Sequence, residues 1–397
     1  MSEKPKMLWH SNAPFGNTGY STQTAMFTRK LKDHYNLAIS AFWGLSGGIV
    51  PWNGIPVLPS DDPSGYGNST IREHINMFGG GDPVTVITLM DVWVLDPQVW
   101  GGLDLACWVP VDHEPAPDPV VNFFRNSGAI PIAMARFGEK MLKDAGLDPL
   151  YVPHAVNTQA YRPHDKAKAR KALGLDPDTY IVGMVAANKG NPSRKCFAEA
   201  IEAFKAFHAR HPEARLYLHT EATGRFGGVD LPGLIHRLGL DPKTVIFTDQ
   251  YRAVHFPHTE EKMGEVMSCF DVLLAPSAGE GFGIPVIEAQ ACGVPVIVSD
   301  FSAQPELVGA GWLVEGATTY TAIGSWQVKP SVADIFKALT KCYGRTDREV
   351  EAGAAAARDK AEQYDTEVVF NDYMLPALAE VHRRIEERNP RPLKAAA

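Results

Sequence analysis

Two glutamates, Glu280 and Glu288, flank seven residues that begin with Gly281, Phe282 and Gly283. The surrounding sequence, residues 269–292, predicts a buried strand, a glycine loop and a short helix. The glycines let a ligand approach the backbone closely. The helix start offers free N–H donors and the positive end of a dipole, which suit a diphosphate. Loop and helix carboxylates can accept hydrogen bonds from sugar and ribose hydroxyls, but the spacing also fits a strand–turn–helix with two solvated acids.

Three cations follow another predicted strand, residues 180–188. Lys189, Arg194 and Lys195 stand in "NKGNPSRKC". Cations at the carboxyl end of a strand can neutralise a departing diphosphate, whose negative charge develops in the transition state. An ordinary solvated loop would carry the same residues.

Two segments of the first half also carry polar or glycine-rich patterns. Asp112, His113 and Glu114 follow a predicted strand, and their spacing is poor for binding a metal. Gly16 and Gly19 lie between the first strand and the first helix, where they would let the loop approach a phosphate or an acceptor. This loop is not GxGxxG, and no acidic ribose ligand follows the second strand, so the pattern argues against an NAD site.

The stretch "EGFGIPVIEAQACGVPVIVSD" resembles the Glu-x7-Glu signature of retaining family 4 glycosyltransferases of the GT-B fold. The resemblance implies that Glu280 holds the donor sugar and Glu288 the donor ribose. It places His113 at the sugar's 6-hydroxyl or the reaction centre. Asp112 would either orient His113 or contact the acceptor. The catalytic set is therefore His113, Asp112 and Glu280, and the donor-binding set is Gly19, Lys189, Arg194, Lys195, Gly281, Phe282, Gly283, Ile284 and Glu288.

The resemblance continues outside that stretch, with departures. "YVPHAVNTQAYRP" is similar to the family's interdomain segment, but Ala155 replaces a glycine and Asn157 an aspartate, so we assign it no catalytic role. Lys189 takes the place of a common arginine, and a lysine lacks the arginine fork. The segment "FSAQPELVGAGWLVEG", which contains Glu306, resembles the segment that follows the signature in the family. The opening residues and "WVPVDHEP" look similar to glycosyltransferases of bacteriophages as well as bacteria.

Strand-like and helix-like stretches alternate along the 397 residues, which predicts βα units and parallel sheets. This length suits two domains. We predict an α/β protein of the GT-B fold, with two doubly wound Rossmann-like domains and an interdomain cleft. Residues 1–160 form an acceptor-side domain and residues 161–376 a nucleotide-sugar-binding domain. Pro376 interrupts the final helical run, and the helix of residues 377–397 packs back on the first domain.

Charge and cysteine content limit the partners and the compartment. Net charge is −8, and residues 1–160 hold ten Lys and Arg against fifteen Asp and Glu, which counts against a broad nucleic-acid groove. The five cysteines are scattered, without CxxC spacing, and are expected to be buried free thiols in a reducing compartment. We find no signal peptide and no apolar run of roughly 18 residues. The expected location is the cytoplasm of a bacterium or a phage-infected host.

The expected function is transfer of a hexose from a UDP- or GDP-sugar, such as UDP-glucose, to a hydroxyl with retention of configuration. No cofactor and no metal are expected, because lysines and helix dipoles supply the positive charge. The acceptor is unknown: a small molecule, a glycan, a lipid or a modified DNA base. Alternatives are glycosylation of a hydroxymethylated pyrimidine in phage DNA, a GT-B-like nucleotide-sugar epimerase, and a non-catalytic nucleotide-sugar sensor.

Overall fold

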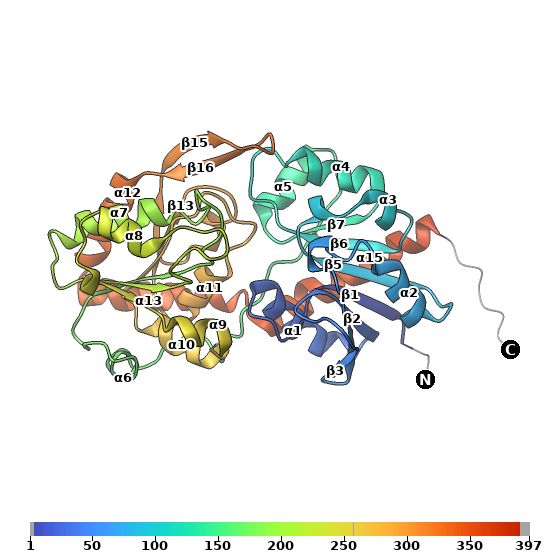
Figure 1. Ribbon diagram of the computed structural model, residues 1–397, viewed down its shortest axis with the longest axis horizontal. Helices are drawn as coiled ribbons and strands as arrows, with labels where there is room; N and C mark the ends of the chain where they lie inside the picture. Colours follow the sequence, from blue (N-terminus) through green and yellow to red (C-terminus); the bar gives the residue numbers. More distant parts are fainter. Residues whose placement is uncertain (1–3, 257, 390–397) are drawn as a thin grey trace. The chain divides into compact units, whose positions relative to one another are not determined.

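The computed structural model describes residues 4–256 and 258–389. The chain forms two compact units (Figure 1). Unit 1 comprises residues 1–111, 115–154 and 367–397, as far as they are described, and unit 2 comprises residues 112–114 and 155–366. The domain ends that we predicted, 160 and 376, lie further along the chain than the limits of these units. Asp112–Glu114 also belong to unit 2, although the residues on both sides of them belong to unit 1.

Unit 1 is built on an eight-stranded sheet of order β3-β4-β2-β1-β5-β6-β7-β8, in which only the β3–β4 pair is antiparallel. The central strands are almost wholly buried, as expected for parallel strands covered on both faces. The strands are β1 Lys6–Asn12, β2 Asn36–Trp43, β3 Val50–Trp52, β4 Ile55–Leu58, β5 Val84–Leu89, β6 Leu105–Val109, β7 Ile130–Ala133 and β8 Leu150–Tyr151.

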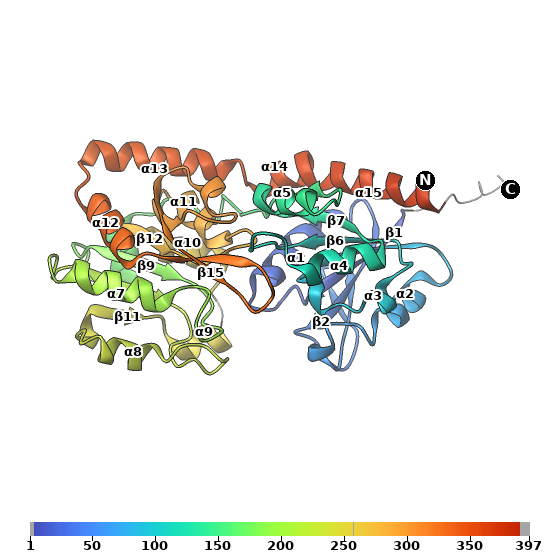
Figure 2. The ribbon, with the colours of Figure 1, turned by 90° about the horizontal axis from the view of Figure 1, so that it is seen from above.

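The helices of unit 1 come from the first part of the chain and from its end. They are α1 Gly19–Leu31, η1 Pro63–Gly65, α2 Ile71–Gly79, η2 Val92–Val94, α3 Pro97–Trp100, α4 Asp118–Ser127, α5 Arg136–Asp144, η5 Phe370–Met374 and α15 Leu375–Arg388, while α14 Thr366–Val369 begins at the last residue of unit 2. Pro376 stands in the first turn of α15, directly after the π-helical turn η5. The His382 ring on α15 stacks on Tyr35, so this helix packs on unit 1 (Figure 2). Residues 390–397 of the predicted final helix lie outside the described residues.

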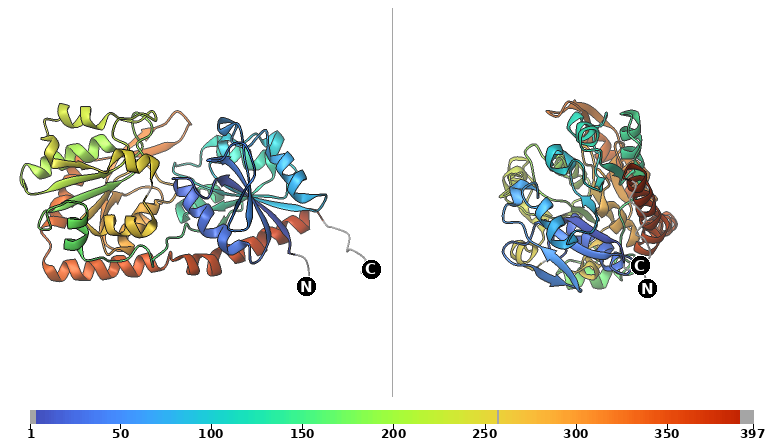
Figure 3. Two further views of the ribbon diagram at one scale, coloured as in Figure 1. Left: turned by 60° about the horizontal axis from the view of Figure 1, so that its bottom comes forward. Right: turned by 90° about the vertical axis from the view of Figure 1, so that its right-hand side faces the viewer.

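Unit 2 contains a six-stranded parallel sheet of order β11-β10-β9-β12-β13-β14. Its strands are β9 Ile181–Val185, β10 Arg215–His219, β11 Val245–Phe247, β12 Val272–Ala275, β13 Val296–Ser299 and β14 Gly311–Val314. An antiparallel hairpin, β15 Gly316–Tyr320 with β16 Trp326–Pro330, follows the last strand and projects from the unit (orange in Figure 3). The two sheets, one wholly and one almost wholly parallel, and the helices between their strands confirm the predicted α/β class.

The helices of unit 2 cover both faces of its sheet. They are α6 Lys166–Ala172, α7 Phe197–His208, α8 Leu231–Arg237, η3 Pro242–Thr244, α9 Gln250–His255, α10 Glu260–Ser268, α11 Ile284–Ala291, η4 Pro305–Leu307, α12 Val332–Tyr343 and α13 Asp347–Glu362. Helices α7 and α12 lie side by side over the core, and α13 runs along α11 (Figure 2). At the sheet, Gly183 of β9 stands opposite Leu273 of β12, and a Cβ on Gly183 would lie 2.2 Å from the Phe270 ring.

Two further expectations concern cysteines and membrane segments. All five cysteines are buried and free, as predicted. Burial raises the pKa of the Cys107, Cys196 and Cys292 thiols to about 12. Among the helices of the described residues, we find none with the length and apolar character needed to cross a bilayer.

Candidate active site

Glu280 lies in the loop between β12 and α11, and its carboxylate is nearly buried, with the residue 8% exposed. Its backbone N–H donates to the Ser302 hydroxyl at 2.8 Å, which fixes the loop. Gly283 precedes α11 with φ of 112°, a conformation that favours glycine. Pro285 occupies the first turn of α11, where its missing N–H costs nothing. The local sequence therefore determines how the loop turns into the helix.

The loop after β9 brings two cations to this carboxylate, because β9 and β12 are parallel neighbours whose carboxyl ends meet at one edge. The Ala278 N–H donates to the Arg194 carbonyl at 2.8 Å, so the two loops are joined through their backbones. Arg194 Nη1 donates to Glu280 Oε2 at 2.9 Å, and Lys195 Nζ donates to Glu280 Oε1. Lys189 is exposed on the same loop.

The electrostatics of this cluster follow from burial and charge. Burial alone would raise the Glu280 pKa, but the Arg194 and Lys195 cations outweigh it and hold the pKa well below its usual range. Burial lowers the Lys195 pKa, and Glu280 opposes that shift. The cluster thus holds an ionised carboxylate between two cations in the protein without a ligand.

Asp112 and His113 join the same cluster. His113 Nδ1 lies 2.7 Å from Asp112 Oδ1, and Asp112 Oδ2 lies 3.6 Å from Arg194 Nη1. Burial raises the Asp112 pKa, but its hydrogen bond to His113 and the Arg194 charge lower it more, so the net shift is downward. Because Asp112 holds the ring at Nδ1, Nε2 is the nitrogen that remains to contact a ligand.

The hairpin β15–β16 holds the Asp112–Glu114 segment against the Glu280 loop. Glu114 and Trp326 exchange two backbone hydrogen bonds of 3.1 and 2.8 Å, and the Val328 N–H donates to the Ala278 carbonyl at 3.0 Å. A Cβ on Gly279 would lie 2.2 Å from the Asp112 carbonyl oxygen, so the two segments meet at a glycine. Sequence reasoning missed this brace, since no motif marks the hairpin as a partner of Glu114.

Glu288 stands on α11 in a different environment. Tyr161 and Glu260 are its titratable neighbours, and both shift the pKa of its carboxyl. The Glu288 pKa is raised to about 7, chiefly by burial; the Glu260 charge adds to the rise and Tyr161 opposes it. Asn157 Nδ2 donates to Glu260 Oε2 at 3.0 Å. The segment to which we assigned no catalytic role therefore supplies two neighbours of this cluster.

The structure thus joins most of the predicted site within unit 2. Asp112, His113, Arg194 and Lys195 gather at Glu280, while Glu288 lies in the Tyr161 cluster. Phe282 is buried with its ring edge-on to Tyr364 at 5.6 Å, so its side chain packs in the interior of the unit. The remaining predicted donor contacts are Gly281, Gly283 and Ile284 at the α11 start, Lys189 on the β9 loop, and Gly19 at the first residue of α1 in unit 1.

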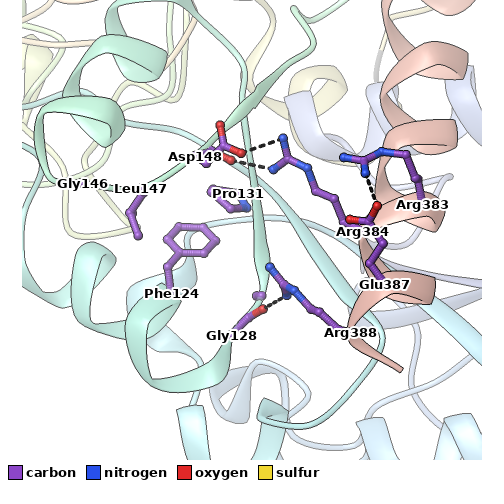
Figure 4. Close-up of a pocket in the computed structure, with 11 residues that line it drawn as sticks. Phe124, Gly128, Pro131, Gly146, Leu147, Asp148, Arg383, Arg384, Glu387 and Arg388 are labelled. Carbon is purple, nitrogen blue, oxygen red and sulfur yellow. Dashed lines mark hydrogen bonds and ion pairs between the residues drawn. The ribbon is translucent and has the colours of Figure 1, made fainter. Parts of the chain in front are cut away.

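No group of three or more His, Cys, Asp or Glu side chains is placed to hold a metal ion within residues 4–256 and 258–389. A cavity of about 480 Å³ occurs in unit 1 (Figure 4), but none of the predicted site residues lines it. Its arginines already have partners. Arg384 Nη2 lies 2.9 Å from Asp148 Oδ2, and Arg388 donates to the Gly128 carbonyl.

Comparison with known proteins places the fold in the GT-B class of glycosyltransferases, as predicted. Residues 179–324 match the family described as glycosyl transferases group 1. Sucrose-phosphate synthase from Thermosynechococcus elongatus superimposes with a TM-score of 0.73 at 16% identity, covering 98% of this chain and 100% of that one. HepE of Anabaena, solved with UDP-glucose, gives a TM-score of 0.66 at 16% identity, covering 94% of this chain and 99% of that one.

Curated relatives include D-inositol 3-phosphate glycosyltransferases. That of Gordonia bronchialis is 28% identical over 254 residues, which is 62% of this chain and 50% of the relative. That of Segniliparus rotundus is 32% identical over 161 residues, 40% of this chain and 33% of the relative. The chain therefore spans about half the length of the first relative and about a third of the second.

Proposed function

We propose that this protein is a retaining glycosyltransferase that moves a hexose from a nucleotide-diphosphate sugar to a hydroxyl acceptor without a metal ion. The carrying observation is the buried Glu280 carboxylate held between Arg194 and Lys195, with His113 oriented by Asp112 in the same cluster. The group 1 family match over unit 2 supports this reaction class. UDP-glucose is the first donor to test, because HepE of Anabaena was solved with it.

In this proposal the donor's C1–O bond to phosphate breaks, and its electron pair stays on the departing diphosphate oxygen. The acceptor oxygen forms the new C1–O bond on the same face, and its proton passes to that phosphate oxygen. Lys195 and Arg194 offset the charge on the diphosphate, since charge that develops in a buried site is best met by preorganised donors. Lys195 has three N–H donors, so it can contact a phosphate while it keeps Glu280.

In this scheme Glu280 accepts hydrogen bonds from hydroxyls of the donor sugar, and its low pKa keeps it ionised throughout the neutral range. The His113 ring, fixed through Nδ1, presents Nε2 to the sugar or the reaction centre. The α11 N-terminus adds free N–H groups beside the diphosphate. Positive charge therefore comes from the chain's own residues.

The test mixes purified protein with UDP-, GDP- and ADP-hexoses and a panel of hydroxyl acceptors, and measures nucleotide release. We expect release that depends on acceptor, persists with EDTA, and gives a product with the donor's anomeric configuration by NMR. Loss of all turnover in EDTA would overturn the metal-free step, and an inverted product would overturn retention. Absence of nucleotide release with every donor would overturn the transferase assignment.

The same assay separates the remaining alternatives. An epimer formed from donor alone identifies an isomerase, and donor binding without turnover identifies a sensor. Transfer to DNA that carries hydroxymethylated pyrimidines would identify a modified base as the acceptor. The excess of acidic residues in residues 1–160 makes this the acceptor we expect least.

A further inference from the structure

Tyr320, Trp326 and Glu114 form a row of exposed side chains on unit 2. Within the β15–β16 hairpin Tyr320 stands opposite Trp326, and their ring centroids lie 4.9 Å apart at an interplanar angle of 61°. On the other side of β16, Trp326 and Glu114 form an antiparallel bridge through their two backbone hydrogen bonds. Residues directly opposite each other in antiparallel pairs point to the same face, so the three side chains lie in line across the hairpin and the Asp112–Glu114 segment.

The exposed side chains of this row are not what holds the hairpin in place. Tyr320 is 62% exposed, Trp326 is 45% exposed, and Glu114 is exposed as well. The hairpin is held by its backbone hydrogen bonds to Glu114 and by a 2.8 Å ion pair between Lys329 and Glu199 of α7. Two large rings that stay open to solvent on a fixed element form a contact surface, because aromatic side chains offer a large area at a low cost in conformational entropy.

The position of Glu114 in the chain relates this row to the predicted reaction centre. Glu114 directly follows His113, whose ring is held by Asp112 in the Glu280 cluster. Consecutive Cα atoms are about 3.8 Å apart, and successive side chains along a strand-like backbone point to opposite sides. The row therefore flanks the reaction centre and does not form part of it. An acceptor with two rings could place one ring at His113 and the other on the row.

The chemistry of the row suits a sugar ring. One face of a hexose carries C–H groups that pack on an aromatic ring, and its hydroxyls donate hydrogen bonds to a carboxylate, which Glu114 supplies next to Trp326. A nucleic acid would bring phosphates that need cations, and the single lysine of the hairpin, Lys329, is already paired with Glu199. A lipid chain would remove water from the Glu114 carboxylate without giving it a hydrogen bond, which is costly.

We propose that Tyr320, Trp326 and Glu114 form a distal acceptor subsite that binds the second ring of an oligosaccharide acceptor, beside the ring that receives the hexose. This inference rests on the proposed function, whose unknown acceptor it narrows to a carbohydrate of more than one ring. The row selects the acceptor and takes no part in bond making. Its binding energy should therefore appear in the KM for the acceptor and not in kcat.

The experiment measures nucleotide release with the sugar donor on which the wild type is most active. The acceptors are glucose, galactose and mannose, disaccharides of these sugars, DNA that carries hydroxymethylated pyrimidines, and vesicles that contain diacylglycerol. The readout is the ratio of kcat/KM for the best disaccharide to that for the best monosaccharide. For the wild type we expect a ratio of about 10, the size of one aromatic stacking contact.

Three variants test which side chain carries the preference. Trp326→Leu should abolish the preference for disaccharides by raising their KM, while the KM for the donor stays unchanged. Trp326→Phe keeps an aromatic face and should retain most of the preference. Trp52→Leu is the matched control, because this partly exposed tryptophan lies on β3 of unit 1 beneath the Arg29 guanidinium and belongs to no predicted site.

The outcomes separate the inference from the proposed function. A wild type that shows no preference for disaccharides, or that transfers only to DNA or diacylglycerol, overturns the inference and leaves the proposed function standing. The inference also fails if the preference survives in Trp326→Leu, or if Trp52→Leu loses it equally. An equal fall in kcat for mono- and disaccharides in Trp326→Leu would show a purely structural role, which overturns it too.

A second variant covers the case in which Trp326→Leu does not fold. Tyr320→Leu changes the most exposed ring of the row and then decides: a smaller preference for disaccharides supports the inference, and an unchanged one overturns it. Absence of nucleotide release from the wild type with every donor and acceptor overturns both the inference and the proposed function.

Discussion

Replacing Glu280 by glutamine tests whether the buried carboxylate is what pairs Arg194 and Lys195. The change keeps the shape and one acceptor oxygen, and removes only the charge. Lys195 then remains in a site that leaves its side chain 20% exposed, whereas the Arg194 side chain is 40% exposed and keeps the Gly279 carbonyl as a partner. The cost should therefore come mainly from the lysine.

Breaking a buried ion pair by removing one partner costs about 3–5 kcal/mol. Solvent at Arg194 and the remaining amide oxygen reduce that figure, so we expect about 2 kcal/mol at pH 7, and for a unit of this size a fall in Tm of about 4–8 °C. The Glu280 pKa is lower in the folded protein than in the unfolded chain. The carboxylate therefore contributes stability above the unfolded pKa of about 4.3, and this contribution is lost as pH falls further.

The assay compares the Tm of wild type and Glu280→Gln at pH 7 and pH 3. Glu265→Gln is the control, since its 2.6 Å pair with Lys262 is more exposed and should be worth no more than about 1 kcal/mol. A Tm difference at pH 7 that is no larger than that of the control would refute the reasoning. So would a difference that does not shrink at pH 3, because the effect must follow the charge.

Three other substitutions test packing and protonation. Gly183→Ala places a Cβ 2.2 Å from the Phe270 ring, so we expect a loss of about 1–3 kcal/mol in urea unfolding, and an unchanged midpoint would contradict the close packing. Gly279→Ala drives a Cβ against the Asp112 carbonyl and should cut turnover by at least about 100-fold, because small misplacements at a reaction centre are costly; near-wild-type turnover would argue against the brace. Burial lowers the His154 pKa to about 3, so between pH 6.5 and pH 3 the unfolded chain binds a proton that the folded chain does not, and this residue alone should lower stability by about 1.4 kcal/mol per pH unit. His154→Gln should reduce the slope of unfolding free energy against pH by the equivalent of one proton. A slope identical to that of wild type would show that His154 does not cause this pH dependence.

The parts of the fold that could be predicted depend on signals within short stretches. The loop and helix around Gly283 follow from a glycine that accepts positive φ, a proline in the first helical turn and a buried run before them. The predicted parallel sheets place the loops of Lys195 and Glu280 at the carboxyl ends of their strands, but that these two strands are neighbours is known only from the structure. The interruption at Pro376 was visible for the same local reason.

The parts that could not be predicted depend on contacts between distant residues. Glu114 bonds to Trp326 across more than half of the chain, and neither residue carries a motif. Asp112–Glu114 therefore belong to unit 2, although a linear reading assigns them to the domain around them. Tyr161 is similar: in sequence it is an aromatic residue of a connecting segment, and only the fold makes it a neighbour that lowers the Glu288 pKa.

The two glutamates that define the motif are chemically identical in the sequence, and the fold gives them opposite electrostatic environments. Glu280 is buried between two cations and has a lowered pKa, whereas Glu288 is partly exposed beside a second carboxylate and has a pKa raised to about 7. Near neutral pH, acidification therefore changes the charge of Glu288 and leaves that of Glu280 intact. In the proposed function, the contact between Glu288 and the donor ribose therefore depends on pH near neutrality. The contact between Glu280 and the donor sugar does not. The spacing of the motif fixes where the carboxylates stand, and their neighbours from distant segments decide which of them is charged.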